Sequence, residues 1–166
     1  MKLGSQRGNT VVEVAIFLPV LMMLLVGMYQ IAQLTYTYYT LRKAVYAAAT
    51  YLSTQQGTDF CNNPSDPNIT AAINFGVTGS TDGSQPSVVS GLTSDMIVVT
   101  PESYDPVAQA VIPYDTSVCS DGDTIPPDYI TVSITNGLTI QLAIPFFSAI
   151  QPLTLSPEVK VPYDGT

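Results

Sequence analysis

Residues 7–28 read Arg-Gly-Asn-Thr-Val-Val-Glu-Val-Ala-Ile-Phe-Leu-Pro-Val-Leu-Met-Met-Leu-Leu-Val-Gly-Met. No side chain in residues 14–28 is polar, and the next charged residue after Glu13 is Arg42. A bilayer core about 30 Å thick is crossed by about 20 helical residues, because each residue adds about 1.5 Å. Residues 14–34 supply this length with two glutamines as interruptions. The stretch therefore predicts a membrane-spanning helix.

The helical pattern continues beyond the apolar run. Apolar residues recur at intervals of seven, four, three and four, which place them on one helix face: Leu34, Leu41, Val45, Ala48 and Leu52. The run does not end in a small-x-small cleavage site, which argues against a removable Sec signal peptide. Gln55-Gln56-Gly57 offers a stop, so we expect one helix from about Asn9 to Thr54.

Two further features belong to this helix. Pro19 lacks an N–H and is expected to kink or locally unwind the helix, which a membrane tolerates when a neighbouring helix covers the freed carbonyl. Four tyrosines fall where the helix would leave the bilayer and are interpreted as an interfacial aromatic belt: Tyr29, Tyr36, Tyr38 and Tyr39.

Glu13 lies at the threshold of the apolar run, where moving deeper would cost a carboxylate about 2.5–3.5 kcal/mol. One interpretation is that it simply lies in the headgroup layer. The other follows from its spacing, because Gly8 precedes it by five residues and two basic residues precede that glycine. This pattern resembles a class III signal peptide, in which a membrane-embedded prepilin peptidase cuts after the glycine. By that resemblance the cut falls between Gly8 and Asn9, and Glu13 becomes the fifth residue of the mature chain.

The longer context contains Arg-Gly-x-x-x-Val-Glu-x-Ala, then Leu-Pro-Val-Leu and a glycine eight residues after the proline. Over residues 7–52 it resembles the TadE-like family, the pseudopilins of tight-adherence (Tad) pilus systems. The resemblance implies a TadE-like minor pilin, a structural subunit for assembly, initiation or the tip of a Tad-type pilus used in surface adhesion. A larger major pilin and an unprocessed single-pass membrane protein with an extracytoplasmic binding domain are the alternatives. The implied partners are other pilin subunits, Tad pilus assembly proteins, the prepilin peptidase and, before assembly, membrane lipid.

The charge distribution bears on partners and location. The chain has 5 basic and 13 acidic residues, a net charge of -8, and its only base after Lys43 is Lys160. Nucleic acid is therefore not an expected partner, because phosphates are bound by clustered bases. Lys2 and Arg7 precede the apolar run, so the positive-inside rule places the N-terminus in the cytoplasm. We expect residence in the bacterial inner membrane with the C-terminal domain outside, then in a pilus or at the cell surface.

The expected organisation has three parts: a prepilin leader at 1–8, a transmembrane and stalk helix at 9–54, and an extracytoplasmic head at 55–166. The head contains both cysteines, Cys61 and Cys119. An even count outside the cytoplasm predicts a disulfide, which would stabilise the head by about 4 kcal/mol in the chain-entropy model. Two buried free thiols are the alternative.

The head begins with residues typical of loops and contains one short predicted helix. Residues 58–87 are rich in Asn, Asp, Gly, Pro and Ser. Within them, residues 68–75 follow Asp66-Pro67 and are expected to form a helix that is closed by Gly76.

Apolar alternation then predicts strands at 96–100, 108–113, 130–135, 138–144 and 153–161. Asn136-Gly137 predicts a two-residue type I′ turn that joins the strands on either side of it as a hairpin. Pro157 places the last strand at an edge or a bulge. A sheet with one apolar face needs a cover, and the long helix is the nearest surface. The sequence predicts an α+β fold: a long N-terminal transmembrane helix that continues into a stalk and packs on a small antiparallel sheet.

Catalytic chemistry has little support in this sequence. There is no histidine, and Ser, Thr and Asp lie in loop signals without a recognisable nucleophile turn, so no catalytic residue and no cofactor is expected. One acidic cluster is a weak calcium candidate: Asp115, Asp121, Asp123 and Asp128. A solvated acidic loop is the favoured interpretation, because the stretch lacks the EF-hand pattern and its terminal glutamate.

Overall fold

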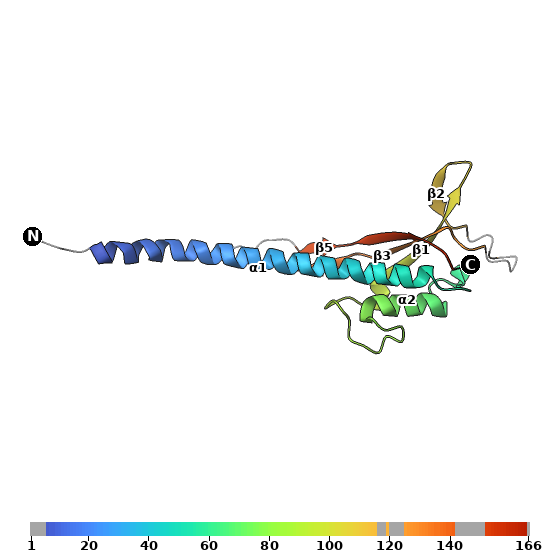
Figure 1. Ribbon diagram of the computed structural model, residues 1–166, viewed down its shortest axis with the longest axis horizontal. Helices are drawn as coiled ribbons and strands as arrows, with labels where there is room; N and C mark the ends of the chain where they lie inside the picture. Colours follow the sequence, from blue (N-terminus) through green and yellow to red (C-terminus); the bar gives the residue numbers. More distant parts are fainter. Residues whose placement is uncertain (1–5, 116–118, 120–124, 142–151, 166) are drawn as a thin grey trace, which may run out of the picture. The chain divides into compact units, whose positions relative to one another are not determined.

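The computed structural model describes residues 6–115, 119, 125–141 and 152–165, with side chains from Val12 onward (Figure 1). The helices and strands are α1 (Gln6–Ser53), α2 (Pro67–Thr78), β1 (Ile97–Asp105), β2 (Ala110–Pro113), β3 (Tyr129–Ile134), β4 (Leu138–Ile140), β5 (Leu153–Leu155) and β6 (Glu158–Pro162). Two short 3₁₀ helices are η1 (Phe60–Asn62) and η2 (Ser94–Met96). A long apolar helix packed on an antiparallel sheet confirms the predicted α+β class.

The chain divides into two compact units. The first contains Met1–Tyr36 with Ile140–Leu153, and the second contains Thr37–Thr139 with Thr154–Thr166. The first unit contributes most of the apolar run of α1. The second unit holds the C-terminal part of α1, the helix α2 and the four-stranded sheet.

The four-stranded sheet has the order β2-β1-β3-β6, and every neighbouring pair is antiparallel. Its register aligns apolar residues on one face, with Val99 opposite Val132 and Val132 opposite Val159. The opposite face is more polar and carries an ion pair between Lys160 and Glu102. Because strand side chains alternate between faces, the sheet has one face that must be covered.

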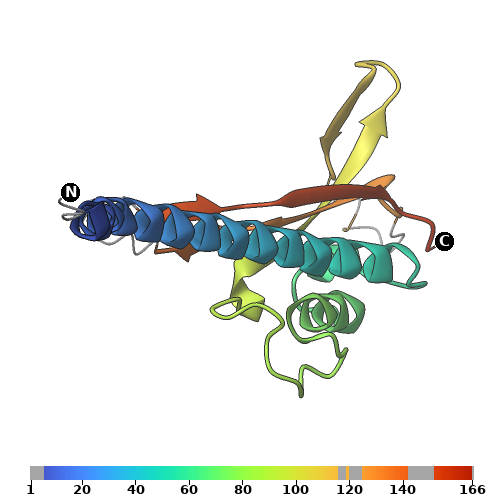
Figure 2. The ribbon, with the colours of Figure 1, turned by 60° about the vertical axis from the view of Figure 1, so that its left-hand side comes forward.

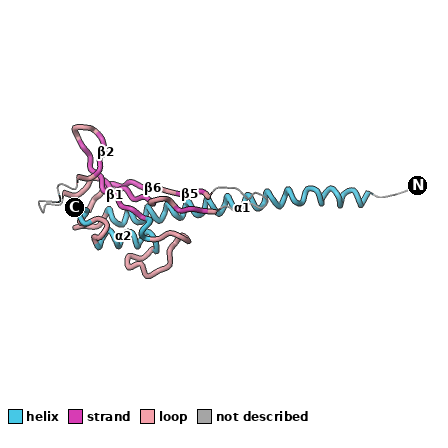
Figure 3. The backbone as a smooth tube through the Cα atoms, turned by 180° about the vertical axis from the view of Figure 1, so that it is seen from behind, coloured by secondary structure: helices cyan, strands magenta, loops and turns pink. Residues whose placement is uncertain are grey.

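The C-terminal part of α1 supplies that cover. Six of its apolar residues are buried: Leu41, Ala44, Val45, Ala48, Ala49 and Leu52. They include all of the predicted face beyond Leu34, so the helical periodicity is confirmed. In all three views α2 and the β1–β2 hairpin lie on opposite sides of this part of α1 (Figures 1, 2 and 3).

Helix α2 extends beyond its predicted end at Gly76. The carboxylate of Asp66 caps its N-terminus by accepting from the backbone N–H of Asn68 at 2.8 Å, and Gly79 closes it with a φ of +77°. Gly76 is instead buried inside the helix, where an added Cβ would lie 2.9 Å from Cβ of Ala48 and 3.0 Å from the carbonyl oxygen of Ala44. Gly76 therefore allows two helices to approach closely, and the expectation that it ends α2 was wrong.

Strand β1 also runs further than predicted. The sequence predicted a strand at 96–100, yet β1 continues to Asp105. Pro101 pairs with Ile130, and its carbonyl accepts from the N–H of Tyr114 at 3.2 Å. The pairing of β1 with β2 begins only at Glu102, so the missing N–H of the proline falls outside that ladder.

The prediction that the strands on either side of Asn136-Gly137 pair as a hairpin was wrong. Both residues have positive φ, +59° and +64°, as the turn requires. However, β3 pairs with β1 and β6, whereas β4 pairs with β5 in a separate two-stranded sheet. Both edges of β3 are therefore occupied. The expected single strand at 153–161 is likewise divided into β5 and β6 around Ser156-Pro157, and β6 lies at a sheet edge as Pro157 suggested.

Gly137→Ala is expected to lower the free energy of unfolding of the second unit by about 2–4 kcal/mol. Alanine is strained in the left-handed conformation of this residue, and its Cβ overpacks the site. An added Cβ at Gly137 would clash with Cγ2 of Thr154 and lie 3.0 Å from the carbonyl oxygen of Leu155. Gly79→Ala is the matched control, because its φ is also positive but nothing lies within 4 Å of the added Cβ. Denaturant unfolding of both variants measures the difference, and equal losses would contradict the close approach at Gly137.

Candidate functional site

The N-terminal part of α1 exposes its apolar side chains. Nearly all large apolar residues that the structure describes there are exposed, and only Val26 is half-buried; the exposed ones are Val12, Val14, Ile16, Phe17, Leu18, Val20, Leu21, Met22, Met23, Leu24, Leu25 and Met28. Among the described residues, α1 is the one helix that is long and apolar enough to cross a membrane, and none of its most apolar window is buried. Such a surface is consistent with membrane anchoring, because a bilayer or apolar partner helices would remove it from water.

Glu13 is the only charged residue between Arg7 and Arg42. It lies on α1, and its side chain is exposed. Its carboxylate forms no ion pair or hydrogen bond with the part of the chain that the structure describes. Gly8 and Asn9 lie in the helical backbone just before it, so Asn9 and Glu13 are one helical turn apart. The helix thus carries one unpaired carboxylate on an otherwise apolar surface.

Pro19 lies inside α1, and the helix continues through it without interruption. Because proline has no N–H, the carbonyl of Ala15 lacks its usual intrahelical donor. The kink expected at Pro19 stays a prediction.

The tyrosines of the predicted interfacial belt are exposed on α1. The exposed fractions of Tyr36 and Tyr39 are 74% and 63%. The hydroxyl of Tyr29 accepts from the side-chain amide of Gln33 at 2.7 Å, and the ammonium of Lys43 lies 5.7 Å from the ring centroid of Tyr39. Amphipathic rings with polar partners suit a membrane–water boundary.

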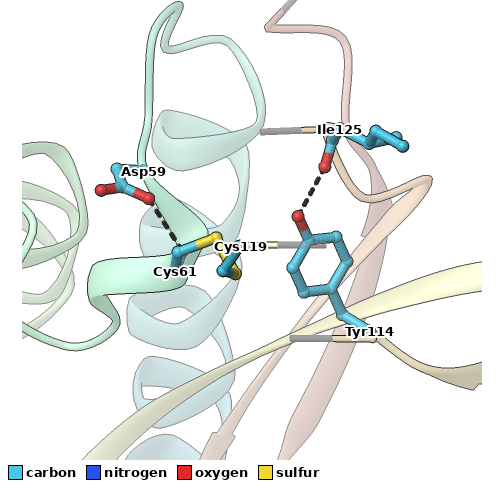
Figure 4. Close-up of a disulfide and its surroundings, with 5 residues drawn as sticks. All are labelled: Asp59, Cys61, Tyr114, Cys119 and Ile125. Atoms are coloured by element: carbon cyan, nitrogen blue, oxygen red, sulfur yellow. Dashed lines mark hydrogen bonds between the residues drawn. A yellow bond between two sulfur atoms is a disulfide. The ribbon is translucent and has the colours of Figure 1, made fainter. Parts of the chain in front are cut away.

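The disulfide between Cys61 and Cys119 is formed, with Cα atoms 5.7 Å apart, so the predicted pairing is confirmed and two free thiols are excluded (Figure 4). Cys61 lies in η1, whose N-cap is Asp59. The carboxylate of Asp59 accepts from the N–H of Cys61 at 2.9 Å. The bridge therefore joins the segment that follows α1 to the segment that follows β2.

The candidate calcium ligands are only partly described. Asp121 and Asp123 lie outside the described residues. Asp128 uses its carboxylate to accept from the backbone N–H of Tyr104 at 2.6 Å, and Asp115 is exposed. The described residues include no group of three or more His, Cys, Asp or Glu that could hold a metal ion. The calcium hypothesis gains no support from this part of the chain.

A pocket of about 280 Å³, which the sequence did not predict, lies in the second unit near the disulfide. It is lined by Gly57, Thr58, Phe60, Tyr114, Ile125, Pro126, Tyr163 and Gly165. Three separate segments supply its aromatic residues. The available sequence signal is that each aromatic residue has an aspartate beside it, in Asp59-Phe60, Tyr114-Asp115 and Tyr163-Asp164. The three dipeptides can be seen in the sequence, but nothing in the sequence indicates that these segments meet in the fold.

Residues 8–50 match the family model described as TadE-like protein. A search of curated proteins and one of solved structures found no match to the chain. The matched range contains Gly8, Glu13, the exposed apolar run and most of the buried face of α1. TadE-like proteins are related to the Tad pilus and are structural rather than enzymatic. The protein therefore carries a TadE-like domain, formed by residues 8–50 of its long N-terminal helix.

Proposed function

We propose that this protein is a TadE-like minor pilin, a structural subunit that initiates a Tad-type pilus or lies at its tip. It is held in the inner membrane by α1, trimmed by a prepilin peptidase between Gly8 and Asn9, and then moved into or under a filament. Its partners are other pilin subunits and the assembly proteins of the same system. The folded head is the reason for preferring a specialised subunit, because by family resemblance the major pilin is much shorter.

The observation that carries the proposal is the exposed, unpaired carboxylate of Glu13 within the matched range. A carboxylate at the edge of an apolar surface is stabilised by an opposite charge, since burying it alone costs several kcal/mol. Within the described residues no cation of the same chain supplies that charge to Glu13. A partner molecule is the natural source.

Cleavage after Gly8 would create that cation. The new α-amine of Asn9 lies one helical turn from Glu13, so packed helices with a small axial offset can pair the amine of one subunit with the carboxylate of the next. In an apolar environment the pair forms only when both charges meet, which favours a single register between subunits. Proteolysis thus both frees the subunit and supplies half of its docking contact.

Gly8→Val is expected to keep the leader attached, because the peptidase site at the membrane face accepts only a small residue before the cut. Intact mass of the membrane-extracted chain should then include residues 1–8, whereas the wild-type chain should lack them. Gly4→Val is the matched control, since it places the same side chain in the same segment and should be trimmed normally. Wild-type and Gly8→Val chains of equal processing state would contradict the assigned cleavage site.

A further inference from the structure

The pocket near the disulfide combines aromatic residues with negative charge. Phe60, Tyr114 and Tyr163 line it, and the rest of the lining adds Ile125, Pro126, Thr58 and glycine residues. None of these lining residues carries a formal charge. Aromatic faces attract cations through the ring quadrupole, and this attraction grows when the cation is removed from water. The lining therefore suits an organic cation better than an anion.

Both tyrosine rings are held in place before any ligand arrives. The hydroxyl of Tyr114 donates to the carbonyl of Ile125 at 2.6 Å (Figure 4), and the hydroxyl of Tyr163 donates to the carbonyl of Gln55 at 2.6 Å. Phe60 packs edge-to-face on Tyr163, with ring centroids 5.1 Å apart. Because the hydroxyl protons are already used, the tyrosines offer a ligand their rings rather than donors. Fixed rings also reduce the entropy lost on binding.

Each aromatic residue of the lining has an aspartate next to it in the sequence. Asp59, Asp115 and Asp164 each adjoin one of the aromatic residues, and both Asp115 and Asp164 are exposed. Burial, followed by the charges of Asp59 and Asp115, raises the pKa of Tyr114 above its usual value. The charge contribution indicates a negative potential at that ring. Such a potential attracts cations from solution.

The one basic residue in residues 55–166 already has a partner. Lys160 is the only basic residue after Lys43, and its ammonium is paired with the carboxylate of Glu102. Lys160 is therefore not available to compete with an external cation.

We propose that this pocket binds a quaternary ammonium group of the choline type. A volume of about 280 Å³ is slightly below the usual range for ligand pockets, about 300–1,000 Å³, which suits a headgroup rather than a large ligand. Methyl groups on nitrogen contact aromatic faces while the positive charge is spread over them. This site gives the head a ligand of its own and does not depend on the pilus assignment.

The direct test compares choline with 3,3-dimethylbutan-1-ol, its uncharged carbon analogue of the same shape. Each is titrated by calorimetry into the full chain in a maltoside detergent. Choline should bind at least about tenfold more tightly, because cation–π attraction and the carboxylates act only on the charged ligand. Equal affinities, or no binding of choline, would overturn the proposal. Tighter binding of N-acetyl-lysine amide than of choline would also overturn it and would indicate a site for protein lysine.

Two variants locate the binding. Phe60→Leu keeps an apolar side chain but removes a ring face and should weaken choline about fivefold to tenfold. Asp115→Asn changes an exposed residue without altering its shape and should weaken choline about twofold to fivefold, with a smaller salt dependence. Asp95→Asn is the matched control, because Asp95 is exposed and adjoins no lining residue. Unchanged choline affinity in the Asp115 variant would contradict the proposed site even if Phe60→Leu failed to fold.

Discussion

Glu13→Gln is expected to yield a normally trimmed protein that stays in the membrane and is excluded from the pilus. The amide has nearly the shape of the carboxylate but no charge, so the α-amine of Asn9 on a neighbouring subunit would be buried without its counter-ion. Such a loss costs several kcal/mol. Because about 1.4 kcal/mol is a factor of ten, the fraction incorporated should fall by roughly two orders of magnitude or more. Immunoblots of sheared fibres and of membranes measure that fraction.

Glu13→Asp is the control for charge. It keeps the carboxylate on a shorter side chain and should retain a measurable part of the assembly that Glu13→Gln loses. Both variants should begin at Asn9, which separates assembly from processing. A Glu13→Gln chain that enters fibres at the wild-type level would refute the pairing mechanism, while the TadE-like domain at residues 8–50 would be unaffected.

The second large effect is expected at the disulfide. Replacing Cys61 and Cys119 together by serine should lower the free energy of unfolding of the head by about 4 kcal/mol, because the bridge spans 58 residues and restricts the unfolded chain. Unfolding of the full chain by urea, followed by tyrosine fluorescence, measures the change. Loss of the bridge should leave membrane insertion by α1 unchanged, because the apolar run contains neither cysteine.

Reduction provides the matching experiment. The wild-type protein in excess dithiothreitol should unfold at the same urea concentration as the double serine variant, since both lack the same covalent constraint. The reductant should have no effect on the double serine variant. A wild-type midpoint that is unaltered by complete reduction would show that the bridge contributes little to stability.

Local patterns of the sequence predicted the helix and its buried face. The spacing of Leu41, Val45, Ala48 and Leu52 is a property of the helix alone, and all four are buried. The apolar run before them could be identified in the same way, because an uninterrupted run of this length and composition is typical of a membrane-spanning helix. Predicting the disulfide required only the even number of cysteines and the assumption that the head lies outside the cytoplasm.

Features that depend on distant partners were not predicted. Glycine is common at helix ends, so Gly76 was expected to end α2. The structure shows instead that the absence of a Cβ at Gly76 makes room for Ala44 and Ala48 of α1. Asn136-Gly137 favours a turn, but the strands that flank it do not pair with each other. β3 pairs with β1 and β6, which are not its neighbours in the sequence. The aromatic pocket was not predicted for the same reason, because its lining comes from four segments: the start of η1 with the residues before it, the residue after β2, residues 125–126 before β3, and the residues after β6.

N-terminal sequencing of the protein recovered from sheared fibres distinguishes a processed pilus subunit from an unprocessed membrane protein. Fibres are separated from membranes, and the band that reacts with an antibody to the head is sequenced. The proposal predicts that this band is present in fibres and begins Asn-Thr-Val-Val-Glu, with Asn9 as its first residue. A chain that still begins at Met1, or that is found only in the membrane fraction, would show that the protein is not a processed pilus subunit.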